Sequence, residues 1–110
     1  ELLILKTGFG KNRDKNIYWS NQPIISSELA KIFRLKFPNL RVFGFDLISL
    51  TSKIDRDEGK KAHEKFLIEN HILILEDMNL KDLNDTPKRV IISPFMVEGA
   101  DGTPCTVISY

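Results

Sequence analysis

Two short runs of the sequence contain apolar residues only, Leu2–Leu5 and Ile72–Leu75. An unbroken apolar run of strand length is typical of a strand that is buried on both faces of a parallel sheet. A third strand-like run, Arg41–Asp46, lies between them and is rich in aromatic and β-branched residues. Helical patterns separate the three runs. This order predicts βαβ units with right-handed crossovers.

The first helical segment begins at Ser26 or Ser27, which are good N-cap residues, and stops before Pro38. Its apolar residues recur at intervals of three to four. We expect them to face the core, and they are Leu29, Ile32 and Phe33.

The second helical segment opens with Asp55-x-x-Glu58, a pattern that resembles a capping box, and runs to about Asn70. Ala62 and Phe66 form its buried stripe, and lysine and glutamate residues occupy the opposite face.

The C-terminal third predicts a β-hairpin. Strand-like Arg89–Val97 contains Pro94, which favours an edge position or a bulge. Turn residues follow in Glu98–Gly102, and Thr103–Ser109 returns as a strand. The sequence therefore predicts an α/β fold for residues 1–110. We expect a single domain with a mixed sheet of about five strands, two main helices and a C-terminal hairpin.

Composition excludes several classes of protein. A net charge of +1 and scattered basic residues give no field or stacking pattern for nucleic acid. No apolar run approaches the roughly 18 residues that a membrane span requires. The only cysteine, Cys105, excludes an internal disulfide and predicts a reducing, cytoplasmic setting in which it is a small buried thiol.

The segment after the first strand carries two weaker signals. Gly8-Phe9-Gly10 resembles a phosphate-binding loop, but neither a third glycine nor a Gly-Lys-Ser/Thr run follows, so nucleotide binding is not favoured. Tyr18 and Trp19 lie in what we expect to be a long loop. Such an aromatic pair either lines a substrate pocket, fills a subunit contact or anchors the loop to the body. We treat Tyr18 and Trp19 as candidate pocket residues.

Both histidines of the chain lie in His63–Glu76, where a helix end leads into the last apolar strand. Because the chain reverses between them, His63 and the strand-end Glu76 return to similar levels. Imidazole and carboxylate together suit zinc or manganese. A hydrogen-bonded core histidine is the alternative interpretation. Two ligands do not hold a metal ion, and the remaining candidates are Asp46, His71, Asp77 and Glu98.

Five stretches, in order, resemble the C-terminal half of the cyclase family, which includes bacterial kynurenine formamidase (arylformamidase) and isatin hydrolase. The stretches are Leu2–Phe9, Gly44–Ser49, Ala62–Leu67, Ile72–Leu80 and Glu98–Pro104. The resemblance implies a larger α/β cyclase-type fold. It also implies a metal-dependent hydrolase, associated with tryptophan catabolism, that opens amide or cyclic amide bonds of small molecules. His63 and Glu76 would be metal ligands, and zinc or manganese would activate water.

The chain also departs from this family. The His-x-Gly-Thr-His-x-Asp run that supplies the other ligands is absent. Together with a strand that starts directly after Glu1, this absence predicts the C-terminal portion of such an enzyme, inactive alone. His63 and Glu76 are 13 positions apart, one more than in commoner members. Either Glu64 takes the place of the histidine, or the turn at residues 68–71 holds one extra residue.

A second hypothesis belongs to a different class of function. The chain would be a non-catalytic α/β module that assembles through an open sheet edge and the loop of Tyr18 and Trp19. Self-association into a homo-oligomer is expected under both hypotheses.

Overall fold

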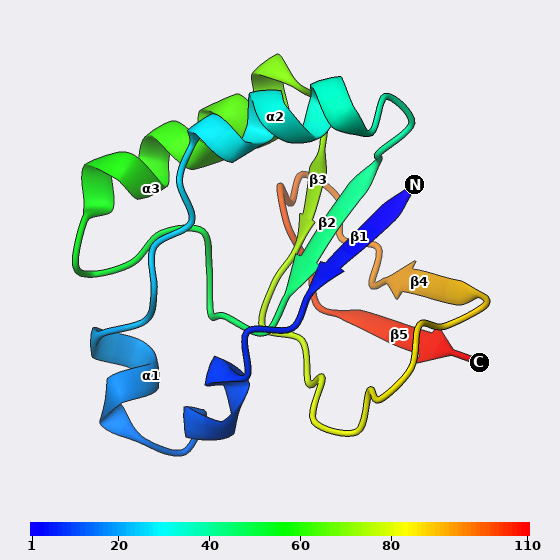
Figure 1. Ribbon diagram of the computed structural model, residues 1–110, viewed down its shortest axis with the longest axis horizontal. Coiled ribbons are helices and arrows are strands. Elements are labelled where there is room, and N and C mark those ends of the chain that lie inside the picture. The colour runs from blue at the N-terminus through cyan, green and yellow to red at the C-terminus, as the bar shows by residue number, and fades with distance from the viewer.

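The computed structural model describes residues 1–110 and shows helices packed on one face of a small parallel sheet (Figure 1). The sheet consists of β1 (Leu2–Leu5), β2 (Val42–Phe45) and β3 (Leu73–Leu75). The two longer helices are α2 (Glu28–Lys36) and α3 (Arg56–His63). A separate hairpin of β4 (Val90–Pro94) and β5 (Cys105–Ser109) follows at the C-terminal end. No helix has the length and apolarity needed to cross a membrane.

The sheet has the order β1-β2-β3 and all of its pairs are parallel, as the βαβ pattern predicts. The expectation of one mixed sheet is wrong, because β4 and β5 pair only with each other and are antiparallel. The first strand, expected to be buried on both faces, forms an edge. β2 occupies the centre because the crossovers from β1 to β2 and from β2 to β3 step in the same direction.

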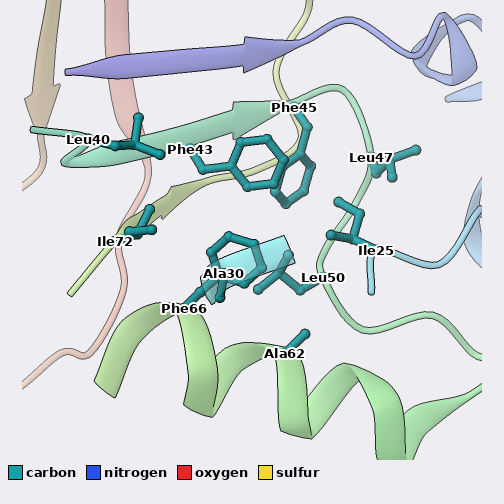
Figure 2. Packing of buried hydrophobic residues seen from close by; sticks show 10 residues of the cluster. All are labelled: Ile25, Ala30, Leu40, Phe43, Phe45, Leu47, Leu50, Ala62, Phe66 and Ile72. Atoms are coloured by element: carbon teal, nitrogen blue, oxygen red, sulfur yellow. The ribbon is translucent and has the colours of Figure 1, made fainter. Parts of the chain in front are cut away.

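The core lies between the sheet and the helices (Figure 2). Phe43 and Phe45 project from β2 toward the helix that carries Ala62 and Phe66, and the rings of Phe43 and Phe66 stack with centroids 5.4 Å apart. All four side chains are fully buried. Burying one phenylalanine stabilises a fold by about 1.5–3 kcal/mol, so this aromatic layer is the main anchor of the helices.

Helix α2 begins after Ser27, as predicted, and the Ser26 hydroxyl accepts from the Glu28 N–H at 3.3 Å, while the N–H of Ser27 is bound by another element. The Glu58 carboxylate of α3 accepts a hydrogen bond of 2.6 Å from the backbone N–H of Ser27. Ile32, expected in the buried stripe, is exposed, and Ala30 is buried instead. The stripe is rotated because α2 packs Ala30 and Phe33 into the core, where Phe33 contacts Phe43 of β2 and Phe66.

Helix α3 begins where the capping pattern predicts it. The Asp55 side chain accepts from the Glu58 N–H at 3.0 Å, whereas the Glu58 side chain binds α2 rather than completing the box. Directly after His63 the helix widens into a π-helix, η2 (Glu64–Glu69). A π-helix has i→i+5 hydrogen bonds and is often found at functional sites.

The face of the sheet away from the helices is only partly covered. Leu73 keeps 60% of its surface exposed, so the expectation that its strand is buried on both faces is wrong. A cavity of about 440 Å³ lies between this face, the segment after β3 and the hairpin. Gly44 faces this side, and a Cβ there would lie 2.7 Å from the sulfur of the flexible Met78 side chain, which would have to move.

The segment between β1 and α2, expected to be a long loop, contains two short helices. These are a 3₁₀ turn, η1 (Phe9–Asn12), and α1 (Asn16–Ser20). The aromatic rings of Phe9 and Tyr18 stack with centroids 6.0 Å apart and hold the two turns together.

Candidate functional site

Polar side chains follow the carboxyl ends of all three parallel strands and meet at one edge of the sheet. Thr7 follows β1, Asp46 follows β2 and Glu76 follows β3. Open α/β sheets bind ligands at this edge, which makes it the candidate site.

The carboxylate of Asp46 is satisfied by hydrogen bonds from within the protein. It accepts hydrogen bonds from the Thr7 N–H (2.8 Å) and hydroxyl (2.6 Å) and from the N–H groups of Gly8 (2.9 Å) and Gly10 (3.4 Å). Burial alone would raise the pKa of Asp46, but these four bonds lower it below its ordinary value. The glycine loop therefore binds an internal carboxylate in the place where a phosphate loop holds its anion.

Glu76 has a different environment, although it also ends a strand. Burial raises the pKa of Glu76 above its ordinary value, while the Ser49 hydroxyl and the charge of His63 lower it to a smaller extent. By its surface area Glu76 is nevertheless exposed. Few donors satisfy its carboxylate, which is near enough to His63 for their charges to interact, so it is free to accept a ligand.

The ring of His63 is oriented by two neighbours. Its Nδ1 lies 2.9 Å from the Gly59 carbonyl oxygen and 3.3 Å from the Thr51 hydroxyl. A carbonyl oxygen only accepts hydrogen bonds, so Nδ1 carries a proton, and in the neutral form of the ring Nε2 keeps its lone pair. A hydrogen bond of this kind to the second ring nitrogen is typical of metal-binding histidines.

The loop that contacts both ligand candidates is fixed by Gln22. The buried amide of Gln22 donates to the carbonyl oxygens of Ser49 (2.7 Å) and Thr51 (3.0 Å) and accepts from the Ile48 N–H (2.9 Å). The loop in turn lies against α3 at Gly59. Gln22 and Thr51 were not singled out from the sequence, because isolated polar residues in loops carry no recognisable pattern, and Ser49 entered there only as the end of the stretch Gly44–Ser49.

The other proposed ligands do not complete a metal site with this pair. His71 and Glu98 are exposed, on the turn before β3 and in the hairpin turn respectively. Asp77 is paired with Arg13 at 2.9 Å. No set of three or more His, Cys, Asp or Glu side chains lies close enough to hold a metal ion. His63 and Glu76 alone have donor atoms that fit zinc or manganese here.

The two aromatic candidates have separate positions. Tyr18 is fully buried, and its hydroxyl donates to the Asp77 carboxylate. Burial, assisted by this bond, raises the pKa of Tyr18 to about 12. Trp19 is half exposed and packs edge-on against Tyr18 with centroids 5.5 Å apart. Neither residue lines the cavity beside Glu76.

Comparisons of the chain with protein-family models, with curated proteins and with solved structures found no match.

Proposed function

We propose that the chain supplies one side of a metal centre in a hydrolase of amide or cyclic amide bonds, with His63 and Glu76 as ligands. The observation that supports this most directly is the orientation of His63, whose Nδ1 is held by the Gly59 carbonyl oxygen at 2.9 Å so that Nε2 is available. The neighbouring Glu76 carboxylate has few internal donors. Zinc or manganese would supply Lewis acidity toward water and the amide carbonyl of a small-molecule substrate.

A catalytic zinc takes three protein ligands, and only two are present at this site. In this proposal the remaining ligands come from a segment outside these 110 residues or from another subunit. The chain alone then binds a metal ion weakly and has little or no hydrolytic activity. Within the site, the role of Ser49 and Thr51 is to hold Glu76 and His63 in place.

Metal titration with detection at the histidine rings tests the proposal. We expect Zn²⁺ to shift the Nε2 resonance of His63 while the Nδ1 proton stays in place, and His63→Asn or Glu76→Gln to abolish the response. His71→Asn is the matched control, because His71 is the other histidine of the chain and is exposed with φ 51, a conformation that asparagine tolerates.

Two results would contradict the proposal. A His63 ring that is unaffected by millimolar Zn²⁺ and Mn²⁺ would exclude the metal site. One tightly held metal ion per chain that is lost in His63→Asn would show that two ligands suffice and that no further segment is needed. Hydrolysis of an N-formyl arylamine by the chain alone would likewise show that no further segment is needed.

A second candidate function, a non-catalytic assembly module, is favoured by the apolar surface of the hairpin. Phe95 and Met96, at the end of β4, keep 70% and 86% of their surfaces exposed. Ile108 and Tyr110 on the returning strand are exposed as well. Apolar surface of this kind is typical of protein–protein contacts. Self-association through the hairpin is also compatible with the hydrolase, which we propose to be a homo-oligomer.

A further inference from the structure

The residue after Glu76 has an unusual backbone conformation. Asp77 has φ 55, in the left-handed region that few residues other than glycine adopt, although aspartate and asparagine adopt it more often than most. Such a conformation persists only where the surrounding structure holds it, and it is often found at ligand-binding sites. Because Asp77 shares a peptide bond with Glu76, its conformation sets the direction in which the chain leaves the candidate ligand.

Asp77 is held at its backbone and at its side chain. Its N–H donates to the Leu47 carbonyl oxygen at 2.7 Å, and its own carbonyl oxygen accepts from Arg13 Nη2 at 2.7 Å. Its Oδ1 accepts from the Tyr18 hydroxyl and pairs with Arg13 Nη2 at 2.9 Å. Arg13 therefore binds both the carbonyl oxygen and the carboxylate of Asp77, and Tyr18 binds the carboxylate.

Arg13 and Tyr18 are themselves fixed by packing. The guanidinium carbon of Arg13 lies 5.8 Å from the centre of the Tyr18 ring, a cation–π distance, and Tyr18 is fully buried against Phe9. The Nε–H of Arg13 is buried without a partner. The guanidinium thus leaves one donor unsatisfied while its Nη2 binds Asp77. This indicates that the contact with Asp77 sets the position of the Arg13 side chain.

We propose that Arg13 and Tyr18 are positioning residues for Glu76, which hold Asp77 in the left-handed conformation and so direct the Glu76 carboxylate toward His63. The inference rests on the proposed function in taking Glu76 as a metal ligand. The orientation of Glu76 is, however, measurable without any metal. A segment that supplies no ligand, residues 9–20, thereby sets the geometry of the site.

Tyr18→Phe is the most conservative test, because it removes one hydroxyl and keeps the buried ring. Without metal, we expect three-bond couplings to show one χ1 rotamer for Glu76 in the wild-type chain and rotamer averaging in Tyr18→Phe. With Zn²⁺, we expect about tenfold weaker binding at His63, as is usual when a group that orients a ligand is lost. Tyr110→Phe is the matched control, and we expect it to leave both readouts unchanged.

Asp77 provides a second, independent pair of variants. Asn accepts the Tyr18 hydrogen bond and tolerates the left-handed region, so Asp77→Asn is expected to keep Glu76 in one rotamer. Asp77→Gly keeps the backbone conformation accessible but has no side chain for Arg13 and Tyr18 to hold. We expect it to release Glu76 and to weaken Zn²⁺ binding about as much as Tyr18→Phe does.

Thermal unfolding of each variant separates positioning from simple stabilisation. If Tyr18→Phe and Asp77→Gly lower Tm while Glu76 keeps a single rotamer and Zn²⁺ affinity is unchanged, the cluster only stabilises the fold and the inference is overturned. If the wild-type His63 ring does not respond to Zn²⁺, the proposed function fails. In that case, the Glu76 rotamers in Tyr18→Phe and Asp77→Gly alone test whether Arg13 and Tyr18 position Glu76.

Discussion

At the scale of single residues, two carboxylates that both end a parallel strand have opposite environments. Asp46 accepts four hydrogen bonds from the loop after β1, which lower its pKa despite burial. Burial raises the pKa of Glu76 because fewer donors compensate for it. The number of donors that face each oxygen, rather than its place at a strand end, decides which of the two can accept a ligand.

Asp46→Asn is expected to destabilise the chain by about 1–3 kcal/mol, because the amide presents N–H groups to donors that are then left unsatisfied. The pKa of Asp46 is lower in the folded state, so its contribution is fully present above the unfolded pKa of about 3.9 and is lost as the pH falls through the folded value. Urea unfolding at pH 7 and pH 3 measures this. Asp85→Asn, at an exposed position, is the control, and an equal effect of both variants would contradict the expectation.

Glu76→Gln is expected to stabilise the chain at neutral pH. The pKa of Glu76 is raised in the folded state, so the wild-type protein loses stability as the pH rises from the unfolded value of about 4.3 through the folded value. The glutamine does not titrate and escapes this loss. Chemical unfolding between pH 4 and pH 8 should show a difference that grows with pH and then levels off. Glu69→Gln, at an exposed position, should show none, and a constant difference across the range would refute the explanation.

At the scale of elements, the site depends on how closely α3 approaches the loop after β2. Gly59 permits this approach, because a Cβ would lie 2.5 Å from the Thr51 Cα and 2.7 Å from its hydroxyl oxygen. The same glycine provides the carbonyl oxygen that orients His63. The π-helix η2 begins directly after His63, so the chain between the two candidate ligands has a wider turn than an α-helix.

Gly59→Ala is expected to destabilise the protein by about 1–3 kcal/mol through overpacking, although alanine is favoured over glycine by about 1 kcal/mol inside a helix. It should also displace the His63 ring. Thermal unfolding and the His63 ring resonances measure the two effects. Gly102→Ala is the matched control, since a Cβ there meets nothing within 4 Å. A higher Tm for Gly59→Ala than for the wild-type chain would show that α3 and the loop after β2 can move apart without loss of stability.

At the scale of the whole molecule, the apolar surface is distributed unequally between the two sides of the sheet. The helix side contains the core, whereas the opposite side is partly open and the hairpin exposes further apolar residues. The two outer strands, β1 and β3, each pair on one side only. These features favour association of the chain with itself or with another segment.

Met96→Lys combined with Phe95→Lys is expected to reduce self-association of the chain, because both side chains are more than two-thirds exposed and a charge at either position opposes apolar contact. Light scattering over a range of concentrations measures the molar mass. Leu35→Lys is the control, because Leu35 is 72% exposed on α2, on the helix side of the sheet. A molar mass that is unchanged in the double variant would exclude the hairpin as the contact.

Local pattern was sufficient for much of the fold. Three apolar or aromatic runs became the parallel strands, Ser27 and Asp55 marked the starts of the two helices, and turn residues marked the hairpin. Each of these features depends on neighbours in the chain, through side-chain periodicity and capping. The two short helices before Gln22 were missed because their stability comes from packing, as in the stacking of Phe9 on Tyr18.

The sequence by itself determined the order of strands and helices and singled out His63 and Glu76 as a candidate pair, because residue type and spacing are local properties. Only the tertiary structure decided that the Asp46 carboxylate binds the glycine loop, that Thr51 contacts His63 and that Arg13 and Tyr18 bind Asp77. These contacts join residues from different elements or depend on close approach in space. Which donor faces which oxygen is therefore settled when the sheet and helices pack.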